Sequence, residues 1–382
     1  MREMIRLVKK LSFVFCACVA VSACTQPGVK EMASEAELTQ FVDPFIGTGF
    51  HGHVFLGANL PFGAVQLGPT NMSEGWDWCS GYHYSDSTIL GFSHTHLSGT
   101  GIGDLGDITV MPVTGNVTMA RGKIGDQQSG YYSLFSHDEE TAKPGYYAVR
   151  LKRYNIKVEL TTTERVGFHR YTFPASEEAK IILDLETGIG WDSPVQTFIQ
   201  QVNDTTISGY RFSKGWAKDQ RIFFTAVFSK PMKNFTVYDS TVANTTTTKT
   251  GKKIRGVASF TTTANEPIQL KVGISPVSIE NAAANIAAEI PHWNFDAIKE
   301  NANKTWNEEL GRIKIKTADT SRLRTFYTAL YHTMIAPSIF NDHNGDYRGT
   351  GCICTAVIAV VIVENRWRNH GVIQRRVKRT QP

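Results

Sequence analysis

The sequence predicts a mainly β protein, an antiparallel β-sandwich that is followed by helices. Between residues 146 and 274, short segments alternate apolar and polar side chains with a period of two, which is typical of half-buried strands. Gly, Pro, Asn and Asp separate these segments, as in antiparallel sandwiches. With 41% hydrophobic residues among 382, the chain can bury a large core. We expect strands at 147–154, 156–160, 167–173, 180–184, 205–212, 220–228, 234–239, 256–262 and 269–274.

After residue 277 the periodicity becomes helical. Residues 279–290 are rich in Ala and Glu, and residues 295–310 and 320–336 place apolar side chains at intervals of three and four. A β domain therefore leads into the first helices of a helical region. The expected apolar faces contain Ile298, Ala302, Trp306 and Leu310 in the first of these helices, and Leu323, Phe326, Tyr327, Leu330, Tyr331 and Met334 in the second.

The N-terminus predicts export. Four basic residues within positions 1–10 precede an unbroken apolar stretch at 11–21, which is the order of a signal sequence. The stretch is shorter than the about 20 apolar residues of a membrane span. It ends in Val21-Ser22-Ala23-Cys24, which resembles a bacterial lipobox with Cys24 as the lipidated first residue. We expect a signal at 1–24, a tether at 25–38, and a lipid anchor in the cell envelope, at the periplasm or the outer-membrane surface; an uncleaved anchor is the alternative.

Cysteine use argues against a disulfide-stabilised fold, and the charge argues against a nucleic-acid-binding protein. Once the signal and Cys24 are set aside, only Cys79, Cys352 and Cys354 remain as thiols, so disulfides do not hold this fold. The net charge of +5 is mild and is partly located at the two ends of the chain. We therefore expect no nucleic-acid partner.

The candidate binding residues lie in the first third of the chain. Residues 41–49 and 57–69 are rich in Gly and Pro, so they form shaped loops, where binding residues usually sit. The next segment, 75–84, holds two indoles, two phenols and an imidazole. Aromatic faces stack on sugar rings while their polar edges bond hydroxyls. The alternative is an aromatic cluster in the core. The predicted sugar contacts are Trp76, Trp78, Tyr82 and His83, together with His94 and His96 from the following segment.

The histidines also allow a metal-site hypothesis. His94 and His96, like His51 and His53, have the spacing that places both side chains on one face of a strand. No Asp or Glu completes a familiar ligand spacing, so we predict no metal site there. The glycine-rich residues 99–106 lack the Gly-Lys-Ser/Thr end of a phosphate loop, which excludes a nucleotide site. Asp77, Asp86, Asp104 and Asp107 lie nearby, but loop aspartates are usually solvated, and we assign none of them a catalytic role.

Three segments in order resemble the opening of glycoside hydrolase family 92. They are Asp43-Pro-Phe-Ile-Gly-Thr-Gly49 with Pro61-Phe-Gly63, Cys79-Ser-Gly-Tyr82, and Gly91-Phe-Ser-His94 with His96-Leu-Ser-Gly-Thr-Gly101. Residues 341–349, Asn-Asp-His-Asn-Gly-Asp-Tyr-Arg-Gly, also resemble the start of the family's helical domain. The resemblance extends over residues 41–350.

The resemblance implies a calcium-dependent exo-α-mannosidase of the inverting, α-1,2 type, acting on mannose-containing glycans. It implies a galactose-mutarotase-like β-sandwich at 39–278, linker helices at 279–318 and the start of an (α/α)6 barrel at 319–350. An inverting enzyme uses two separated carboxylates so that water enters between sugar and base, and oxygen-ligated calcium suits a polyol.

The resemblance also implies that the general acid, the general base and the calcium ligands come from the barrel beyond residue 350. We therefore name no catalytic or metal-binding residue in this chain and expect it to be an inactive fragment. Residues 351–363 form a β-branched run, and a basic end follows, which suggests a frameshift near Gly351 and an aberrant tail at 351–382. Without the barrel, the face formed by Phe326, Tyr327, Tyr331 and Met334 is expected to be exposed. The alternatives are a non-catalytic glycan-binding surface lipoprotein and a metal enzyme built on the four histidines.

Overall fold

The computed structural model describes residues 37–349 and 353–354. The signal, the predicted lipidation site Cys24, the tether up to residue 36 and nearly all of the predicted aberrant tail lie outside the described residues. No described helix has the length and hydrophobicity that crossing a membrane requires.

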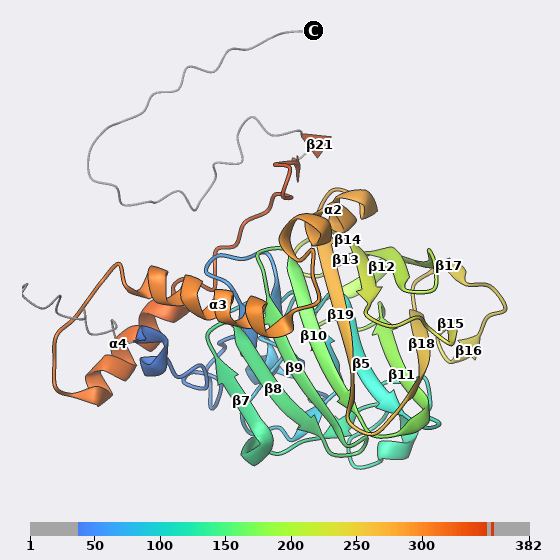
Figure 1. Ribbon diagram of the computed structural model, residues 1–382, viewed down its shortest axis with the longest axis horizontal. Helices are drawn as coiled ribbons and strands as arrows, with labels where there is room; N and C mark the ends of the chain where they lie inside the picture. Colours follow the sequence, from blue (N-terminus) through green and yellow to red (C-terminus); the bar gives the residue numbers. More distant parts are fainter. Residues whose placement is uncertain (1–36, 350–352, 355–382) are drawn as a thin grey trace, which may run out of the picture. The chain divides into compact units, whose positions relative to one another are not determined.

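Two large antiparallel sheets form the body of the described chain, as the sequence predicts (Figure 1). In spatial order, the eight-stranded sheet contains β1 (Ala58–Asn59), β2 (Gln66–Thr70), β4 (Gly91–Ser93), β5 (Thr109–Thr114), β11 (Ser176–Asp184), β18 (Ile254–Thr262), β15 (Asn234–Asp239) and β16 (Val242–Ala243). The nine-stranded sheet contains β17 (Thr248–Gly251), β12 (Ser193–Gln201), β13 (Thr206–Lys214), β14 (Gln220–Phe228), β19 (Glu266–Ser275), β10 (Val166–Phe173), β9 (Ile156–Thr162), β8 (Tyr146–Leu151) and β7 (Glu140–Lys143).

Short elements complete the fold. They are the two-stranded pairs β3 (Thr88–Ile89) with β6 (Ser133–Leu134) and β20 (Tyr347–Arg348) with β21 (Ile353–Cys354), and the 3₁₀ turns η1 (Leu38–Phe41), η2 (Trp76–Trp78), η3 (Gln127–Ser129) and η4 (His137–Glu139).

The main core lies between the two sheets. Inward-facing residues from both sheets, such as Ile181 and Ala258 in one and Leu160 and Leu270 in the other, belong to one buried cluster. Period-two patterning predicts these strands well. The nine segments expected to be strands do not include β1, β2, β4, β5, β7, β16 or β17, nor β12, which pairs with β13 along its length. Most of its residues are polar or partly exposed, and its register shifts between Pro194 and Gln196, so its apolar alternation is weak.

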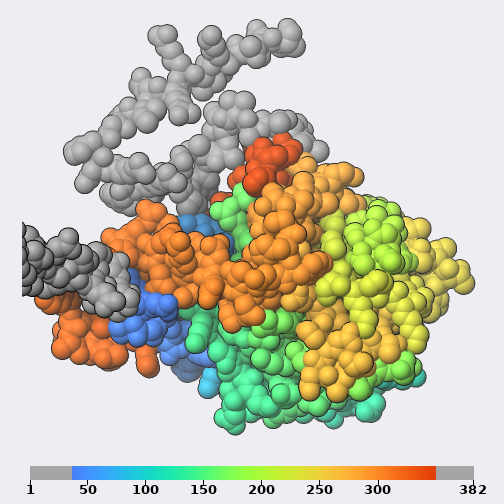
Figure 2. All heavy atoms as spheres, in the orientation of Figure 1, coloured from blue at the N-terminus to red at the C-terminus, as the bar shows by residue number. Residues whose placement is uncertain are grey.

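The three helices begin at side-chain caps and pack on the sandwich. Ser278, Asn294 and Asp319 accept hydrogen bonds from the first turns of α2 (Ile279–Glu289), α3 (Phe295–Leu310) and α4 (Thr320–His332), respectively. The helix α2 contacts β19 and β14, and α3 contacts β9 and β8. Figure 2 shows the side chains of α2 and α3 as an orange band over the strands.

The apolar face of α4 corrects one expectation. Tyr327, Tyr331 and Met334 are buried, not exposed, because they pack with Val42, Phe55 and Trp306 in a second core cluster. The segment that begins at η1 covers this face and lies beside α4 in Figure 1. The start of the helical region is therefore packed onto residues 38–55 of the same chain.

Candidate functional site

The glycine loop (residues 99–106) connects the segments that carry the candidate residues. The amide of Gly99 donates to the carbonyl of His53 at 2.7 Å, and the amide of Gly106 donates to that of Thr95 at 3.0 Å. Cys79 Sγ lies 3.1 Å from the carbonyl oxygen of Thr100, and burial raises the pKa of this thiol to about 11, so it stays protonated. Three segments distant in sequence thus meet at one loop.

The same loop binds two further segments. The amides of Ile189 and Trp191 donate to the carbonyls of Leu105 and Gly103, both at 3.0 Å. The amide of Ala217 donates to Asp104 Oδ2 at 2.9 Å. Residues 188–192 and 215–217 are therefore fixed to the loop through their backbones.

Glycine is required where the loop meets its neighbours. A Cβ at Gly103 would lie 2.8 Å from the Cα of Gly190, and one at Gly101 would lie 2.6 Å from Nε1 of Trp76. Gly190 itself has a φ of +60°, which favours glycine. The glycines thus allow close backbone approach, which is a different role from that of a phosphate loop.

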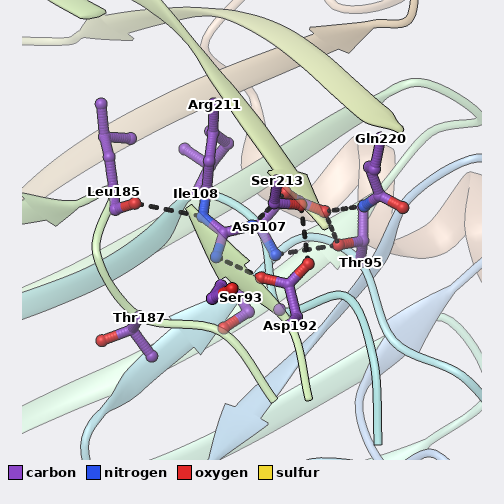
Figure 3. A network of polar contacts seen from close by, with 12 residues as sticks. Ser93, Thr95, Asp107, Ile108, Leu185, Thr187, Asp192, Arg211, Ser213 and Gln220 are labelled. Atoms are coloured by element: carbon purple, nitrogen blue, oxygen red, sulfur yellow. Dashed lines mark hydrogen bonds and ion pairs between the residues drawn. The ribbon is translucent and has the colours of Figure 1, made fainter. Parts of the chain in front are cut away.

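The Arg211 cluster (Arg211, Asp107 and Asp192) is buried, and its polar contacts are shown in Figure 3. Arg211, from β13, donates through Nη1 to Asp107 Oδ1 at 2.8 Å and through Nη2 to Asp192 Oδ1. Its Nε donates to the carbonyl of Leu185 at 3.1 Å. The guanidinium therefore ties β13 to the end of the glycine loop and to the 188–192 segment.

Every carboxylate oxygen of the cluster has a partner. Asp107 Oδ2 accepts from Thr95 Oγ1 at 2.7 Å and also from Gln220, and Asp192 Oδ2 accepts from Ser213 Oγ at 2.6 Å. Burial, together with the nearby Asp107 charge, raises the pKa of Asp192 to about 6 although Arg211 opposes the shift. Asp104 and Asp107, expected to be solvated, are thus buried structural groups.

Trp76 is the most exposed of the six predicted sugar contacts, at 58%. Its ring centroid lies 4.3 Å from that of His53 and 5.5 Å from that of His51. His51 Nδ1 lies 2.9 Å from Asp77 Oδ1, and this hydrogen bond lowers the pKa of Asp77. An open indole face therefore stands next to an ionised carboxylate.

The rings of Trp78 and His83 are in contact. Their ring centroids are 4.8 Å apart, and Trp78 Nε1 donates to Asp86 Oδ2 at 3.0 Å. Trp78 is half-buried, whereas both ring nitrogens of the buried His83 have partners, Ser85 Oγ at 2.7 Å and the carbonyl of Phe50 at 2.9 Å. His83 thus orders two loops.

Tyr82 and His94 are sealed in the core, with 1% and 0% of their surface exposed. The Tyr82 hydroxyl donates to Glu140 Oε2 at 3.0 Å, and His94 Nδ1 donates to the carbonyl of Ile108 at 2.7 Å. This corrects the expectation that these two side chains touch a sugar. Their large apolar surfaces and bonded polar atoms hold the loops onto the sandwich.

His94 belongs to a histidine chain (His94, His169 and Tyr171). His94 Nε2 lies 3.0 Å from His169 Nε2, and the Tyr171 hydroxyl lies 2.7 Å from His169 Nδ1. Because the Ile108 carbonyl can only accept, His94 carries its proton on Nδ1, His169 donates from Nε2, and Tyr171 donates to His169. Burial lowers the pKa of His94 to about 4 and that of His169 well below its usual range, so the chain is neutral.

His96 is also buried, and its pKa is lowered to about 4 by burial. Its Nδ1 donates to the carbonyl of Gln66 at 2.8 Å. Its Nε2 has no partner among the described residues and faces Gly81, where a Cβ would lie 3.1 Å away. His94 and His96 therefore point to separate environments, each closed by other parts of the chain.

A pocket of about 340 Å³ lies where residues 338–342 cross the ends of β14 and β19. At its rim, Arg348 Nη1 donates to Asp219 Oδ2 at 3.2 Å, and Arg165 Nε donates to the carbonyl of Asn341 at 2.6 Å. Asp342 anchors the crossing segment by accepting from Ser275, Asn281 and Asn285. The residues that line the pocket are Ala64, Gln66, Thr95, Leu105, Arg165, Ala217, Asp219, Gln220, Arg221, Ile222, Ile274, Ser275, Pro276, Ser338, Ile339, Phe340, Asn341, Asp342 and Arg348.

None of the six predicted contacts lines this pocket, although Thr95, between His94 and His96, does. Sequence reasoning missed Gln66, Arg165, Asp219 and Arg348 as pocket residues. The available signal was the family resemblance of residues 341–349, which contain the pocket residues Asn341, Asp342 and Arg348.

The described residues do not fit a calcium ion. Within 37–349 and 353–354, no group of three or more His, Cys, Asp and Glu side chains is placed to hold a metal. The carboxylates nearest to the pocket, Asp219 and Asp342, already bond Arg348 and the amides of α2.

The chain is similar to known proteins over most of its length. Residues 41–275 match the Glycosyl hydrolase family 92 N-terminal domain, and residues 281–357 match the Glycosyl hydrolase family 92 catalytic domain. A curated "Uncharacterized secreted glycosidase" of Arthroderma benhamiae is 28% identical over 342 residues, which are 81% of this chain and 43% of that protein.

Two solved structures from Bacteroides thetaiotaomicron share the fold. A family GH92 alpha-mannosidase in complex with mannoimidazole has a TM-score of 0.80 at 38% identity, covering 84% of this chain and 43% of its own. A family GH92 inverting mannosidase has a TM-score of 0.72 at 25% identity, covering 82% of this chain and 42% of its own. The chain therefore spans less than half the length of these relatives.

Proposed function

Because this chain belongs to glycosyl hydrolase family 92, we propose that it supplies the N-terminal part of the substrate site of an inverting exo-α-mannosidase of the α-1,2 type. Support comes from the mannosidases whose fold it shares, one bound to mannoimidazole and one described as inverting. Its ligands in this proposal are mannose-containing glycans.

The observation that carries the proposal is the open face of Trp76. The glycine loop fixes this indole at Gly101, and Asp77 stands beside it with carboxylate oxygens that can bond hydroxyls. A flat apolar face with polar neighbours suits the C–H face of a sugar ring. Trp78 is the second proposed contact, His83 supports its ring, and His96 supports the loop at Gly81.

We propose that the chain by itself binds mannosides without hydrolysing them. An inverting glycosidase needs a general acid and a general base about 6.5–9.5 Å apart, and each such group contributes about 10² to 10⁴ in rate. No described carboxylate is assigned either role, and the calcium expected for the family would have its ligands outside the described residues.

Calorimetry on the purified full chain tests this proposal with mannose and α-1,2-mannobiose. Trp76→Ala is expected to weaken binding about three- to tenfold, since an aromatic contact is worth about 0.5–1.5 kcal/mol. The matched control is Trp293→Ala, which removes an indole that is 37% exposed and lies over Lys271. No binding of either sugar, or equal affinities for the wild type and Trp76→Ala, would exclude the proposed site.

A non-catalytic glycan-binding lipoprotein is the second candidate, favoured by the fact that the Trp76 face is complete within the described residues. The two candidates differ in what the whole gene encodes. Nucleotide sequencing downstream of codon 350 separates them: another reading frame that encodes helical-barrel sequence with paired carboxylates would favour the enzyme, whereas its absence would favour the binding protein.

We also propose that Cys24 anchors the exported chain to the cell envelope through lipid. Support comes from the N-terminal pattern and from the relative described as secreted. Cys24→Ala is expected to move the protein from the membrane fraction to the soluble fraction, and an unchanged distribution would contradict the anchor.

A further inference from the structure

Two indoles outside the predicted site are more exposed than Trp76. Trp191 and Trp216 have 67% and 65% of their surface exposed. By contrast, Trp306 is fully buried and donates from Nε1 to the carbonyl of Asn59. Burying a Trp side chain is strongly favourable, so two indoles this open are unusual for a surface without a ligand.

Trp191 and Trp216 lie just beyond one end of the β12–β13 ladder, one next to each strand. Ser193 pairs with Lys214 in the antiparallel register. Trp191 comes two residues before Ser193, and Trp216 comes two residues after Lys214, so both residues leave the same end of the ladder. The backbones do meet there, since a Cβ at Gly215 would lie 3.1 Å from the Cα of Asp192.

The backbone beneath this indole pair (Trp191 and Trp216) is rigidly held. Asp192, next to Trp191, bonds Arg211 and Ser213 inside the Arg211 cluster. The amide of Ala217, next to Trp216, donates to the buried Asp104. Each indole therefore directly precedes a residue that is hydrogen-bonded to a buried group, which reduces the ordering cost of binding.

The glycine loop connects the indole pair to the Trp76 ring. Gly101 of the glycine loop contacts the Trp76 ring, and Gly103, two residues later, accepts the hydrogen bond from the Trp191 amide. Two residues of chain span at most about 7 Å. One oligosaccharide can therefore reach both places.

A common local pattern links the three indoles. Trp76, Trp191 and Trp216 each follow a glycine directly, whereas Trp78, Trp293 and Trp306 do not. Glycine at the preceding position leaves the indole free of a neighbouring side chain on that side.

We propose that Trp191 and Trp216 form a second stacking site, which binds an inner sugar residue of the same oligomannoside whose terminal mannose lies on Trp76. The inference rests on the proposed function and deepens it, because it assigns the chain a preference for oligomannosides over mannose. The occupant is a neutral sugar ring. A second copy of the chain is the competing occupant.

Calorimetry on the full chain with mannose and with linear α-1,2-mannotriose tests the inference. The wild type is expected to bind the trisaccharide about three- to tenfold more tightly than mannose through the added stacking. The double variant Trp191→Ala/Trp216→Ala should lose this gain and keep the mannose affinity. Trp191→Tyr should retain part of the gain, because a phenol still presents a flat face. Trp293→Ala is the control for loss of an indole elsewhere.

The outcomes separate the inference from the proposed function. If the wild type binds mannose and the double variant keeps the full trisaccharide gain, the second site is wrong and the Trp76 site stands. If the double variant instead changes the oligomeric state and leaves the trisaccharide affinity unchanged, a second copy covers the pair and the inference is overturned. If the wild type binds neither sugar, both proposals fail. Thermal unfolding of each variant checks that the fold is intact.

Discussion

The Arg211 cluster and the histidine chain are both buried polar centres, but one holds charges and the other holds none. Arg211 pairs with two carboxylates beneath the indole pair. His94, His169 and Tyr171 form neutral hydrogen bonds between the first third of the chain and β10. Both centres fasten loops to the sandwich. Because one depends on charge and the other on neutral partners, they should respond differently to truncation and to pH.

The difference follows from desolvation. Removing an ion from water costs several kcal/mol even after relaxation, so a buried charge persists only with full pairing. The Arg211 cluster meets this condition, since each carboxylate oxygen accepts at least one hydrogen bond. In the histidine chain, burial lowers both histidine pKa values instead, and the groups stay uncharged. The charged centre is thus sensitive to loss of a partner, and the neutral one to protonation.

The largest effect is expected for Arg211→Met. It leaves Asp107 and Asp192 buried without their cation, and breaking a buried pair in this way costs about 3–5 kcal/mol. Urea unfolding of the wild type and the variant measures the loss. The matched control is Arg322→Met, which removes an 80% exposed guanidinium paired with Asp319 and should cost no more than about 1 kcal/mol. Similar losses at the two positions would contradict the distinction between buried and exposed pairs.

Lowering the pH should weaken the fold through the buried histidines. The folded pKa of His94 and of His96 is about 4, below the usual 6.5, so the unfolded chain binds protons first as the pH falls. Each histidine contributes up to roughly 3 kcal/mol to the free energy of unfolding. This contribution is fully present above about pH 6.5 and is lost progressively toward pH 4. Asp192 acts in the opposite direction, because its raised pKa of about 6 favours the folded state as it protonates.

Urea unfolding measured from pH 7.5 to pH 4.5 tests this pH dependence. The unfolding free energy should fall across the range, and His94→Gln should show a shallower fall than the wild type. Equal slopes would mean that His94 is not held neutral. Because slopes are compared, any uniform destabilisation by the glutamine does not affect the test.

The sandwich and the helices could be predicted because their burial follows a local period. The four residues expected on the buried face of α3, Ile298, Ala302, Trp306 and Leu310, are all buried. The partner of the α4 face could not be predicted, because residues 38–55 cover it from almost 300 positions away. A local pattern indicates that a face is apolar but does not identify what covers it.

The loops were harder because no period governs them. Trp76 and Tyr82 lie six residues apart, yet one is open and the other sealed. The difference depends on two contacts distant in sequence. Glu140, on β7, accepts a hydrogen bond from the Tyr82 hydroxyl, and Gly101 packs against the Trp76 ring. The indole pair was missed because each indole stands alone between strands. The Gly-Trp pairs at 190–191 and 215–216 were the available signal.

Ser213→Ala tests the charged centre by removing one hydroxyl. Asp192 Oδ2 would lose the donor that lies 2.6 Å away, and hydrogen bonds to charged groups are worth about 1.5–3 kcal/mol. The loss should be larger at pH 7.5 than at pH 5, because the pKa of Asp192 is about 6 and the carboxylate needs the donor more than the neutral acid does. Urea unfolding at the two pH values measures it. A loss that is independent of pH would show that Asp192 does not titrate in this range.

Tyr171→Phe makes the corresponding change in the neutral centre and should have the smallest effect, about 1 kcal/mol. The ring stays in the core, and only the hydroxyl that donates to His169 Nδ1 at 2.7 Å is lost. The control Tyr84→Phe, at a side chain that is 45% exposed, should change the unfolding free energy by less than about 0.5 kcal/mol. If Tyr171→Phe costs as much as Ser213→Ala at pH 7.5, then burial alone sets the value of these hydroxyls. A clearly smaller cost would show that the charge on Asp192 makes its hydroxyl partner the more important of the two.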